Sequence, residues 1–481
     1  MIIKILFLII FPAYANVISK DRVETQSDCA LTESLKEEIQ KYQPVVDRIA
    51  HEILNGKFKG ETYNSLLDFT DKFGARMVGS TNLENAIDFM LEEFKKQGLE
   101  NVHGEKAEVT HWIRGVERAS VLSPYEGNLP ILGLGTSVGT PKKGLKAGVV
   151  VVESFDELKA LPDSEVDGKI VVFVPKWESY GKTVIYRARG AVEAAKKGAV
   201  ASLIRSITPF SIGSLHTGMQ VYDDDVPKIP TASITVEDAS RLLRLYRKNE
   251  TITIKIRMDD YDAGKTTSRN TIGELVGSVY KNTSVVVVSG HLDSWDVGVG
   301  AMDDGGGSWI SWKAVQYLKA MDLRPKRTIR AILWTGEEFG LLGAKAYETA
   351  HKSHEQEEFN FFIESDAGTF EPRGLDFTGN KEAECIFKEV LKLMTPINAT
   401  EFDSPADGGP DVSWWMKRGF PGASLLNKGE KYFWYHHSAG DSMLVEDTVD
   451  LDRGTALFAA AAYVIADLSV DIPKTVTNLG N

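Results

Sequence analysis

The sequence predicts an α/β fold in which a mostly parallel β-sheet lies between layers of helices, with a β-rich module inserted near the middle. Two observations support this prediction. Strands and helices alternate regularly from residue 270 onward, and a block of short β-branched strands precedes them over 121–261. The chain has 481 residues, of which 43% are hydrophobic. It is long enough for roughly two or three domains with cores of their own.

The N-terminus predicts export from the cytosol. Lys4 is followed by an apolar run at 5–11 and by Ala-Tyr-Ala at 13–15, so residues 1–15 are expected to be a cleaved signal peptide. A buried N-terminal strand or helix is the alternative. Residues 16–44 are expected to be either a removable pro-segment or an N-terminal arm. The rest of the sequence has no apolar run long enough for a membrane span, so none is expected.

Sequons, cysteine content and net charge indicate an exported protein that is not built on disulfides and does not bind nucleic acid. Glycosylation triplets begin at Asn249, Asn282 and Asn398, as expected for an exported chain. Only two cysteines occur, Cys29 and Cys385, so core packing or a partner subunit must stabilise the fold instead of a disulfide framework. Sequence alone leaves open whether the two cysteines pair. A formal net charge of −13 argues against a nucleic-acid partner, which would need a basic surface.

The first part of the chain is predicted to be helical. A charged helix over 33–41 stops near Pro44. Apolar residues then recur with a period of about 3.6 over 46–54 and 86–94, and Gly98 provides a stop. We interpret the apolar stripes of these helices as parts of the core.

The pattern changes near Ser120. Strands are expected at 148–153, 167–173 and 199–204, an alanine-rich helix at 186–197, and a strand, a helix and a strand within 234–258. Because the βα pattern resumes afterwards, residues 121–261 are expected to be an inserted domain. This insertion divides the main domain into 45–120 and 262–481.

The last part of the chain predicts the sheet of the main domain. Its strands are expected at 271–275, 284–289, 328–334, 360–364 and 423–426. Helical stretches separate them, which calls for parallel strands covered on both faces. Ligands of such sheets bind beyond the C-terminal ends of the strands. We therefore expect His291, Glu337, Glu338 and Asp366 to meet at one edge.

The side chains at that edge predict a centre for two metal ions. Imidazole and carboxylate groups suit Zn²⁺, and a paired site needs a carboxylate that can bridge the ions. Asp293 follows His291 by two residues and is expected to hold the other ring nitrogen of that histidine. Asp303 stands before Asp304 and three glycines, where the backbone can turn tightly into a helix.

Glu337 and Glu338 are adjacent, so they are expected to divide two tasks. One can bind a metal ion while the other acts as general base on the bound water. Taken alone, the glutamates could be a solvated acidic loop, Asp366 a strand cap, and the pair His436 and His437 a polar stop after an aromatic cluster. Their common position in one domain, at strand ends and in order, favours the metal centre.

Five segments contain these candidate residues: GHLDSWDVG at 290–298, GAMDDGGG at 300–307, TGEE at 335–338, ESDAGTF at 364–370 and YFWYHHSAGD at 432–441. They resemble segments of the di-zinc aminopeptidase and glutamate carboxypeptidase family. The resemblance covers nearly the whole chain after the signal peptide, and VDGKIVV at 166–172 resembles a protease-associated domain. Gly336 stands where the family commonly has alanine, which is a small-for-small change.

The resemblance implies a secreted or lysosomal zinc exopeptidase that hydrolyses short peptides, notably dipeptides with free termini. The implied ligands are His291 and Asp366 for one zinc ion, Glu338 and His437 for the other, and Asp303 as the bridge between them. Glu337 is then the general base. His437 fits the family pattern of a histidine followed by Ser/Thr-x-x-Asp, so His436 is expected to lie beside the ligands or to face the substrate.

The resemblance also implies a cis peptide bond after Asp303 and a homodimer in which 208–225, with His216, helps to close the site. Two other functions remain open. One is an inactive receptor or binding protein of the same fold, and the other is a single-zinc acyltransferase of the glutaminyl cyclase type. A zinc content of two, none or one per chain separates the peptidase, the binding protein and the acyltransferase.

Overall fold

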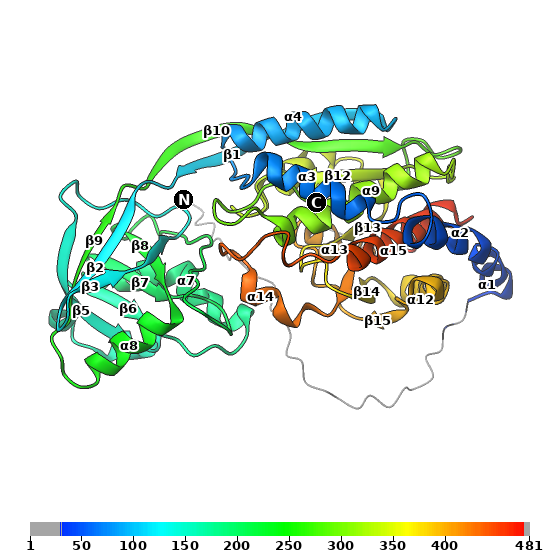
Figure 1. Cartoon of the computed structure of the whole chain (residues 1–481). Coiled ribbons are helices and arrows are strands. Elements are labelled where there is room, and N and C mark those ends of the chain that lie inside the picture. The colour runs from blue at the N-terminus through cyan, green and yellow to red at the C-terminus, as the bar shows by residue number, and fades with distance from the viewer. Residues whose placement is uncertain (1–28, 30, 476–481) are drawn as a thin grey trace, which may run out of the picture.

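The computed structural model describes residues 29 and 31–475, which form two β-sheets joined by a pair of long strands (Figure 1). The predicted signal peptide at 1–15 and the first part of the predicted pro-segment at 16–44 lie outside the described residues. Within the described part, no helix is both long and apolar enough to cross a membrane.

The main sheet has eight strands in the order β1-β10-β12-β11-β13-β16-β14-β15. Their bounds are β1 Glu100–Ile113, β10 Tyr261–Leu275, β11 Val285–His291, β12 Ile329–Trp334, β13 Phe359–Glu364, β14 Pro372–Thr378, β15 Glu401–Asp403 and β16 Gly422–Asn427. The four central strands β12, β11, β13 and β16 run parallel, whereas the pairs β1 with β10, β10 with β12, and β14 with β16 are antiparallel.

The main sheet is therefore mixed. The prediction of parallel strands is confirmed for the four central strands and for β14 with β15, and it is wrong for β1 with β10, β10 with β12 and β14 with β16. Parallel neighbours need a long crossover connection, usually a helix. Strand β14 follows β13 after a short loop without a helix, so it runs in the opposite direction. Strands β1 and β10, which precede and follow the second sheet in the sequence, pair with each other as a two-stranded ribbon. Both connections force antiparallel pairing.

Helices cover both faces of the main sheet. One layer contains α1 Glu33–Gln40, α2 Gln43–Leu54, α3 Glu61–Phe73, α4 Thr81–Lys96, α9 Gly306–Ala320, α12 Lys381–Lys392 and α15 Thr448–Asp467, and the other contains α10 Leu342–His351 and α13 Ser413–Lys417. The valines of β11 alternate between the layers: Val286 and Val288 pack in the first core, and Val285 and Val287 in the second. This two-residue alternation explains why the strand is apolar on both faces.

The second sheet lies between β1 and β10 in the sequence and has the order β3-β2-β9-β5-β6-β7-β8-β4. Its strands are β2 Glu117–Ser123, β3 Gly127–Leu129, β4 Ile131–Gly133, β5 Leu145–Val152, β6 Ile170–Phe173, β7 Ala201–Arg205, β8 Thr231–Ile234 and β9 Thr253–Met258. Helix α8 (Val236–Tyr246) packs on one face, and α5 (Phe155–Ala160) and α7 (Tyr180–Ala195) pack on the other. The short helix α6 (Asp163–Val166) precedes β6.

This second sheet is also mixed. Strands β5, β6, β7 and β8 are parallel. The segments that connect each of them to the next are therefore crossover connections. Helix α7 begins six residues earlier than the predicted helix at 186–197. The module is thus a layered α/β structure as well as a β-rich one.

A short segment of the main domain lies between the two sheets. It contains α14 (Tyr432–Tyr435), which Figure 1 places between the two sheets. The remaining short elements are a π-helical turn at Ala301–Gly305, 3-10 turns at Thr395–Ile397 and Gly429–Lys431, and α11 at Glu355–Glu358.

The N-terminal arm is attached to the helices of the main sheet. Cys29 forms a disulfide with Cys385 in α12, which answers the question that the sequence left open. Ile39 of α1 is buried, and the hydroxyl of Tyr42 donates a 2.6 Å hydrogen bond to the carbonyl oxygen of Asp467. The described part of the arm therefore packs as an integral layer of the fold.

Candidate metal centre

The ends of three central strands bring the predicted ligands to one edge of the main sheet. His291 is the last residue of β11, Glu337 and Glu338 follow β12, and Asp366 follows β13 by two residues. Strand β11 pairs in parallel with both β12 and β13, so these three C-terminal ends lie side by side. Side chains far apart in the sequence therefore converge, as expected for a parallel sheet.

One group of donors surrounds His291. Its Nε2 lies 3.3 Å from Oδ1 of Asp303 and 3.3 Å from Oδ1 of Asp366. Its Nδ1 lies 2.9 Å from the carbonyl oxygen of Asp293 and 3.6 Å from Oδ1 of the same residue. When Nδ1 donates to that carbonyl, Nε2 is left to bind a cation where the two carboxylates meet.

A second group of donors surrounds His437. Its Nε2 lies 2.9 Å from Oε2 of Glu338 and 3.4 Å from Oδ2 of Asp303. Nε2 of His436 lies 3.6 Å from the same oxygen of Asp303. Asp303 thus directs one oxygen toward His291 and the other toward His437, which is the arrangement that a carboxylate shared by two ions requires.

Buried carboxylates hold the backbone around Asp303. Asp441 accepts hydrogen bonds from the backbone N–H groups of Ala301, Met302 and Asp303, at 2.9, 2.7 and 3.2 Å. The peptide bond from Asp303 to Asp304 is cis, as the family resemblance implies. Charge-assisted bonds of this kind are about twice as strong as neutral ones, so Asp441 fixes the loop that carries Asp303.

Asp293 connects the loop after β11 with the loop after β12. Its carboxylate accepts the backbone N–H of Glu337 at 3.2 Å and that of Glu338 at 3.4 Å. The sequence predicted Asp293 as a partner of His291, and the structure adds that its carboxylate also orients both glutamates. Two strand ends are therefore fixed relative to each other by one buried side chain.

The electrostatics of the centre fit bound cations. Burial raises the pKa of Glu337 and of Glu338 well above the ordinary value, with Asp366 and Asp303 respectively as the next largest causes. Burial also raises the pKa of Asp366 to about 6. Among the described residues, Nε2 of His291, Oδ2 of Asp303 and Oε1 of Glu338 are buried without a hydrogen-bond partner. Carboxylates packed close together, and buried nitrogen and oxygen atoms without hydrogen-bond partners, are suited to binding divalent metal ions.

Loops of the second sheet cover the second group of donors. The backbone N–H of Thr217 donates to the carbonyl oxygen of His437 at 2.9 Å, and Nδ1 of His216 lies 2.7 Å from the carbonyl oxygen of His436. Nη1 of Arg187, in α7, lies 3.4 Å from Nδ1 of His437. The segment 208–225 thus approaches the site within a single chain.

Aromatic contacts reinforce this junction. Tyr180 stacks on Phe433 with ring centroids 4.6 Å apart, and Phe210 stacks on Trp434 at 4.3 Å. The hydroxyl of Thr208 donates to the carbonyl oxygen of Phe433 at 2.7 Å. Neither Tyr180 nor Arg187 was predicted as a site residue, because Tyr180 precedes the predicted helix at 186–197 and Arg187 stands in its ordinary alanine-rich pattern.

His216 gives a prediction about pH. Burial lowers the pKa of His216 to about 4, whereas an unfolded histidine titrates near 6.5. Between pH 6.5 and about 4, His216 binds a proton in the unfolded chain but stays neutral in the folded chain. The free energy of unfolding should therefore fall by about 3 kcal/mol as the pH is lowered through this range. Urea unfolding at several pH values should show this component in the wild type and not in His216→Gln. The exposed His51→Gln serves as control, and identical pH profiles for all three proteins would contradict the assignment.

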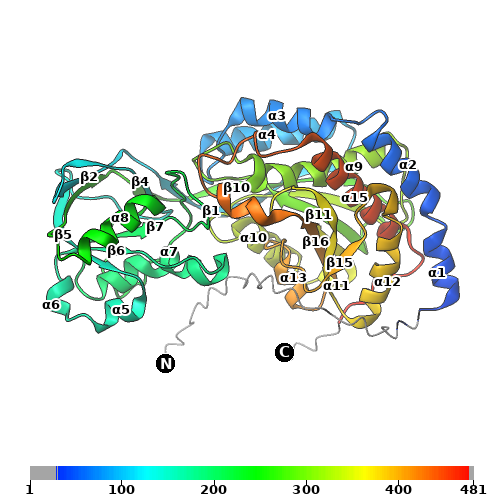
Figure 2. The ribbon, with the colours of Figure 1, turned by 60° about the horizontal axis from the view of Figure 1, so that its bottom comes forward.

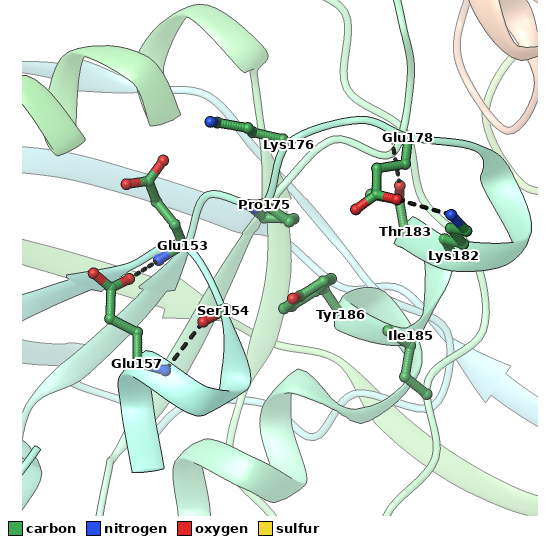
Figure 3. A pocket seen from close by; sticks show the side chains of 10 residues that line it. All are labelled: Glu153, Ser154, Glu157, Pro175, Lys176, Glu178, Lys182, Thr183, Ile185 and Tyr186. Atoms are coloured by element: carbon green, nitrogen blue, oxygen red, sulfur yellow. Dashed lines mark hydrogen bonds and ion pairs between the residues drawn. The ribbon is translucent and has the colours of Figure 1, made fainter. Parts of the chain in front are cut away.

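A cavity of about 640 Å³ lies elsewhere, between the end of β5 and α7 (Figure 3). Glu153, Glu157, Glu178 and Lys182 are among its lining residues. Lys182 pairs with Glu178 at 3.0 Å, the carboxylate of Glu157 accepts the backbone N–H of Glu153, and the backbone N–H of Glu157 donates to the hydroxyl of Ser154 at 3.0 Å. The cavity shares no residue with the metal centre, and we assign no role to it.

Known proteins resemble this chain over most of its length. Residues 270–462 match the model of peptidase family M28. Carboxypeptidase Q from Xenopus laevis is 49% identical over 92% of this chain and 93% of its own length, and the human carboxypeptidase Q is 48% identical over the same shares. The chain belongs to peptidase family M28.

This M28 chain also matches solved structures. The crystal structure of an M28 peptidase precursor from Shewanella amazonensis has a TM-score of 0.86 and 32% identity, and the match covers 91% of this chain and 100% of that one. A zinc aminopeptidase from Bacillus subtilis has a TM-score of 0.66 at 18% identity, which concerns the fold alone. The M28 assignment makes the chain a metallo-exopeptidase, as the sequence predicted, and zinc is the metal that the family implies.

Proposed function

We propose that this M28 peptidase binds two zinc ions and hydrolyses short peptides from a free terminus. The proposed ligands are His291 and Asp366 for one ion, Glu338 and His437 for the other, and Asp303 for both. The observation that carries the proposal is the division of the two Asp303 oxygens, one 3.3 Å from His291 Nε2 and the other 3.4 Å from His437 Nε2. His436 is proposed to lie beside these ligands, 3.6 Å from Asp303.

Zinc ions at these positions would lower the pKa of a bound water and polarise the substrate carbonyl. Glu337 is proposed as the general base, which accepts the proton of the attacking water and returns it to the leaving nitrogen. Its position supports this role: it directly precedes Glu338, and Asp293 holds its backbone N–H at 3.2 Å. Adjacent glutamates point in different directions, so one can bind metal while the other handles the proton.

The proposed substrates are dipeptides and other short peptides with free termini. Arg187 supports recognition of the C-terminal carboxylate. Its side chain is 3% exposed, and its partners within the described residues are the carbonyl of Thr217 at 3.2 Å, the hydroxyl of Tyr180 at 2.8 Å and the ring of His437. Its Nε has no hydrogen-bond partner there. A buried guanidinium without a carboxylate is costly, and a carboxylate of the substrate would pair with it through two hydrogen bonds.

Arg187→Met is therefore expected to raise KM for a dipeptide by roughly 10- to 100-fold, because a desolvated charge pair contributes about 1.5–3 kcal/mol. The KM for the same dipeptide with an amidated C-terminus should change little, and zinc content should stay the same. Arg189→Met is the matched control, since Arg189 lies on the same helix and pairs with Asp223 at 2.6 Å. An equal loss on both substrates would argue for a structural role of Arg187.

Two other functions are separated by one measurement. An inactive binding protein of this fold would hold no zinc, and an acyltransferase of the glutaminyl cyclase type would hold one ion per chain. We expect two ions per chain at the metal centre together with hydrolysis in a panel of dipeptides. The complete set of donors at the metal centre favours the peptidase over both. A zinc content of one with no dipeptide hydrolysis would overturn the proposal.

The setting of the enzyme is also proposed. Residues 1–15 are proposed as a signal peptide and 16–44 as a pro-segment or an N-terminal arm, and the enzyme is proposed to act in lysosomes or outside the cell as a homodimer. The three sequon asparagines, Asn249, Asn282 and Asn398, are exposed, which suits glycosylation. Residues 121–261 are proposed as a protease-associated-like domain inserted into a catalytic domain of 45–120 and 262–481, and the separate cores of the two sheets support that division.

A further inference from the structure

A second group of nitrogen and oxygen donors lies at the end of α10. It consists of His351, the last residue of α10, His354 in the following turn, and Glu358, the last residue of α11. Each residue offers one ligand atom within 4.8 Å of the other two. Nδ1 of His351 lies 2.7 Å from Oε2 of Glu358, and Nε2 of His354 lies 3.1 Å from the same oxygen. The three side chains thus converge on one point.

The remaining polar atoms of the trio are held by neighbours. Nε2 of His351 lies 3.2 Å from Oε1 of Glu105, which comes from β1. Oε1 of Glu358 accepts a 2.6 Å hydrogen bond from Arg330. Nδ1 of His354 lies 3.1 Å from Oγ of Ser353. Metal-binding histidines in proteins almost always have their other ring nitrogen held in this way, which fixes the tautomer and the ring orientation.

Packing also fixes two of the three donors. The ring of His351 stacks on Tyr347 with centroids 4.0 Å apart and planes inclined by 23°. The side chain of Glu358 is 7% exposed, whereas that of His354 is 53% exposed. Two donors are therefore rigid, and the third leaves the remaining coordination positions open to water. A tetrahedral ion with three protein ligands and one water fits this arrangement.

The charged groups at and near the trio leave a net negative charge that a divalent cation would balance. With neutral imidazoles, the carboxylate of Glu358 contacts the guanidinium of Arg330, which also contacts Glu274 at 2.6 Å, and the carboxylate of Glu105 contacts His351. Three negative charges and one positive charge leave a net charge of about −2, by formal charges at neutral pH. A divalent ion would balance it.

The trio is separate from the metal centre. Strand β13 begins directly after Glu358 and ends two residues before Asp366, so the two groups stand at opposite ends of one central strand. Six strand residues span about 20 Å. Figure 2 labels α10 and α11, which provide His351 and Glu358, and His354 lies in the turn between them. Binding at one group therefore requires no residue of the other.

We propose that His351, His354 and Glu358 form a second metal site, which binds Zn²⁺ and closes the turn between α10 and β13. Two imidazoles and one carboxylate are donors that Zn²⁺ prefers over Ca²⁺ or Mg²⁺, which favour oxygen ligands. The ion ties the C-terminal end of α10 to the residue that precedes a buried central strand. It serves structure, and it takes no part in the peptidase reaction.

Without a metal ion, the same contacts of His351 with Glu105 and Glu358 can be ion pairs. Burial lowers the pKa of His351, but Glu105 and Glu358 outweigh this effect and raise the pKa to about 9. A protonated His351 would then hold both carboxylates as ion pairs. Zinc and this proton compete for the same imidazole, so the two states are distinguished by counting metal ions.

The test compares zinc content in full-length wild type, His354→Ala and the control His51→Ala after dialysis against buffer with micromolar free Zn²⁺. His354 is chosen because its side chain is exposed and, among the described residues, makes polar contacts with Ser353 and Glu358 alone, so its replacement should leave the fold intact. His51 is 68% exposed and lies 3.8 Å from Glu52, which matches an exposed histidine beside a glutamate.

His354→Ala should hold one zinc ion per chain fewer than wild type and His51→Ala, with unchanged dipeptide hydrolysis. Only the difference between proteins is used, so the result does not depend on how many ions the metal centre holds. Equal zinc content in all three proteins would overturn the proposal and leave the ion-paired state. An equal decrease in both variants would overturn it as well, because it would indicate general binding to exposed histidines.

Discussion

Replacing Glu337 by glutamine should lower kcat for dipeptide hydrolysis by about 10²- to 10⁴-fold, the contribution typical of a general base. Glutamine has nearly the same shape but cannot accept a proton, so the attacking water would stay protonated. Because Glu337 is not a proposed ligand, zinc content should not change. The measurement is steady-state hydrolysis of a dipeptide together with the zinc content of the same preparation.

The neighbouring residue provides the control for this prediction. Glu338 has Oε2 2.9 Å from Nε2 of His437 and is a proposed ligand. Glu338→Gln should therefore lose zinc as well as activity, whereas Glu337→Gln should lose activity alone. If Glu337→Gln keeps wild-type kcat, or if both variants lose zinc to the same extent, the two glutamates do not divide the tasks as proposed.

Replacing Asp303 by asparagine should weaken the binding of both zinc ions by roughly 100-fold or more, since even outer partners of metal ligands contribute 10- to 100-fold. One Asp303 oxygen lies 3.3 Å from His291 and the other 3.4 Å from His437. An amide cannot supply two anionic oxygens. Zinc titration with a competing chelator would measure the change.

Asp403→Asn is a suitable control for Asp303→Asn, because Asp403 is exposed at the end of β15. It should bind zinc like the wild type and hydrolyse dipeptides at the same rate. Loss of only one zinc ion in Asp303→Asn would mean that Asp303 serves a single ion. The reaction would then have to be assigned to a centre without a shared carboxylate.

The predictable part of the centre is the part that regular strands position. The apolar runs before His291, Glu337 and Asp366 predict parallel strands, and parallel strands bring their C-terminal ends to one edge. No strand carries His437. It lies in the left-handed region, with φ of 58°, after the short helix α14, and only the family resemblance pointed to it.

The unpredicted part depends on contacts between segments far apart in sequence. Strand β1 is 14 residues long and has polar residues on both sides, so hydrophobic periodicity does not reveal it; it exists because it pairs with β10 along its length. Arg187 likewise stands in an alanine-rich helix without a local signal. Its position beside His437 follows from how the second sheet docks on the main one, which no spacing within α7 encodes.

The disulfide between Cys29 and Cys385 sets a limit on maturation by proteolysis. A protease that cuts after residue 29 and before residue 44 would sever the backbone yet release nothing, because the freed piece would stay attached to α12. Such a nicked protein would migrate as one band on a non-reducing gel and as two after treatment with a thiol. Zymogen processing at this end can shed a peptide only by cutting upstream of Cys29, or in a compartment reducing enough to open the bond.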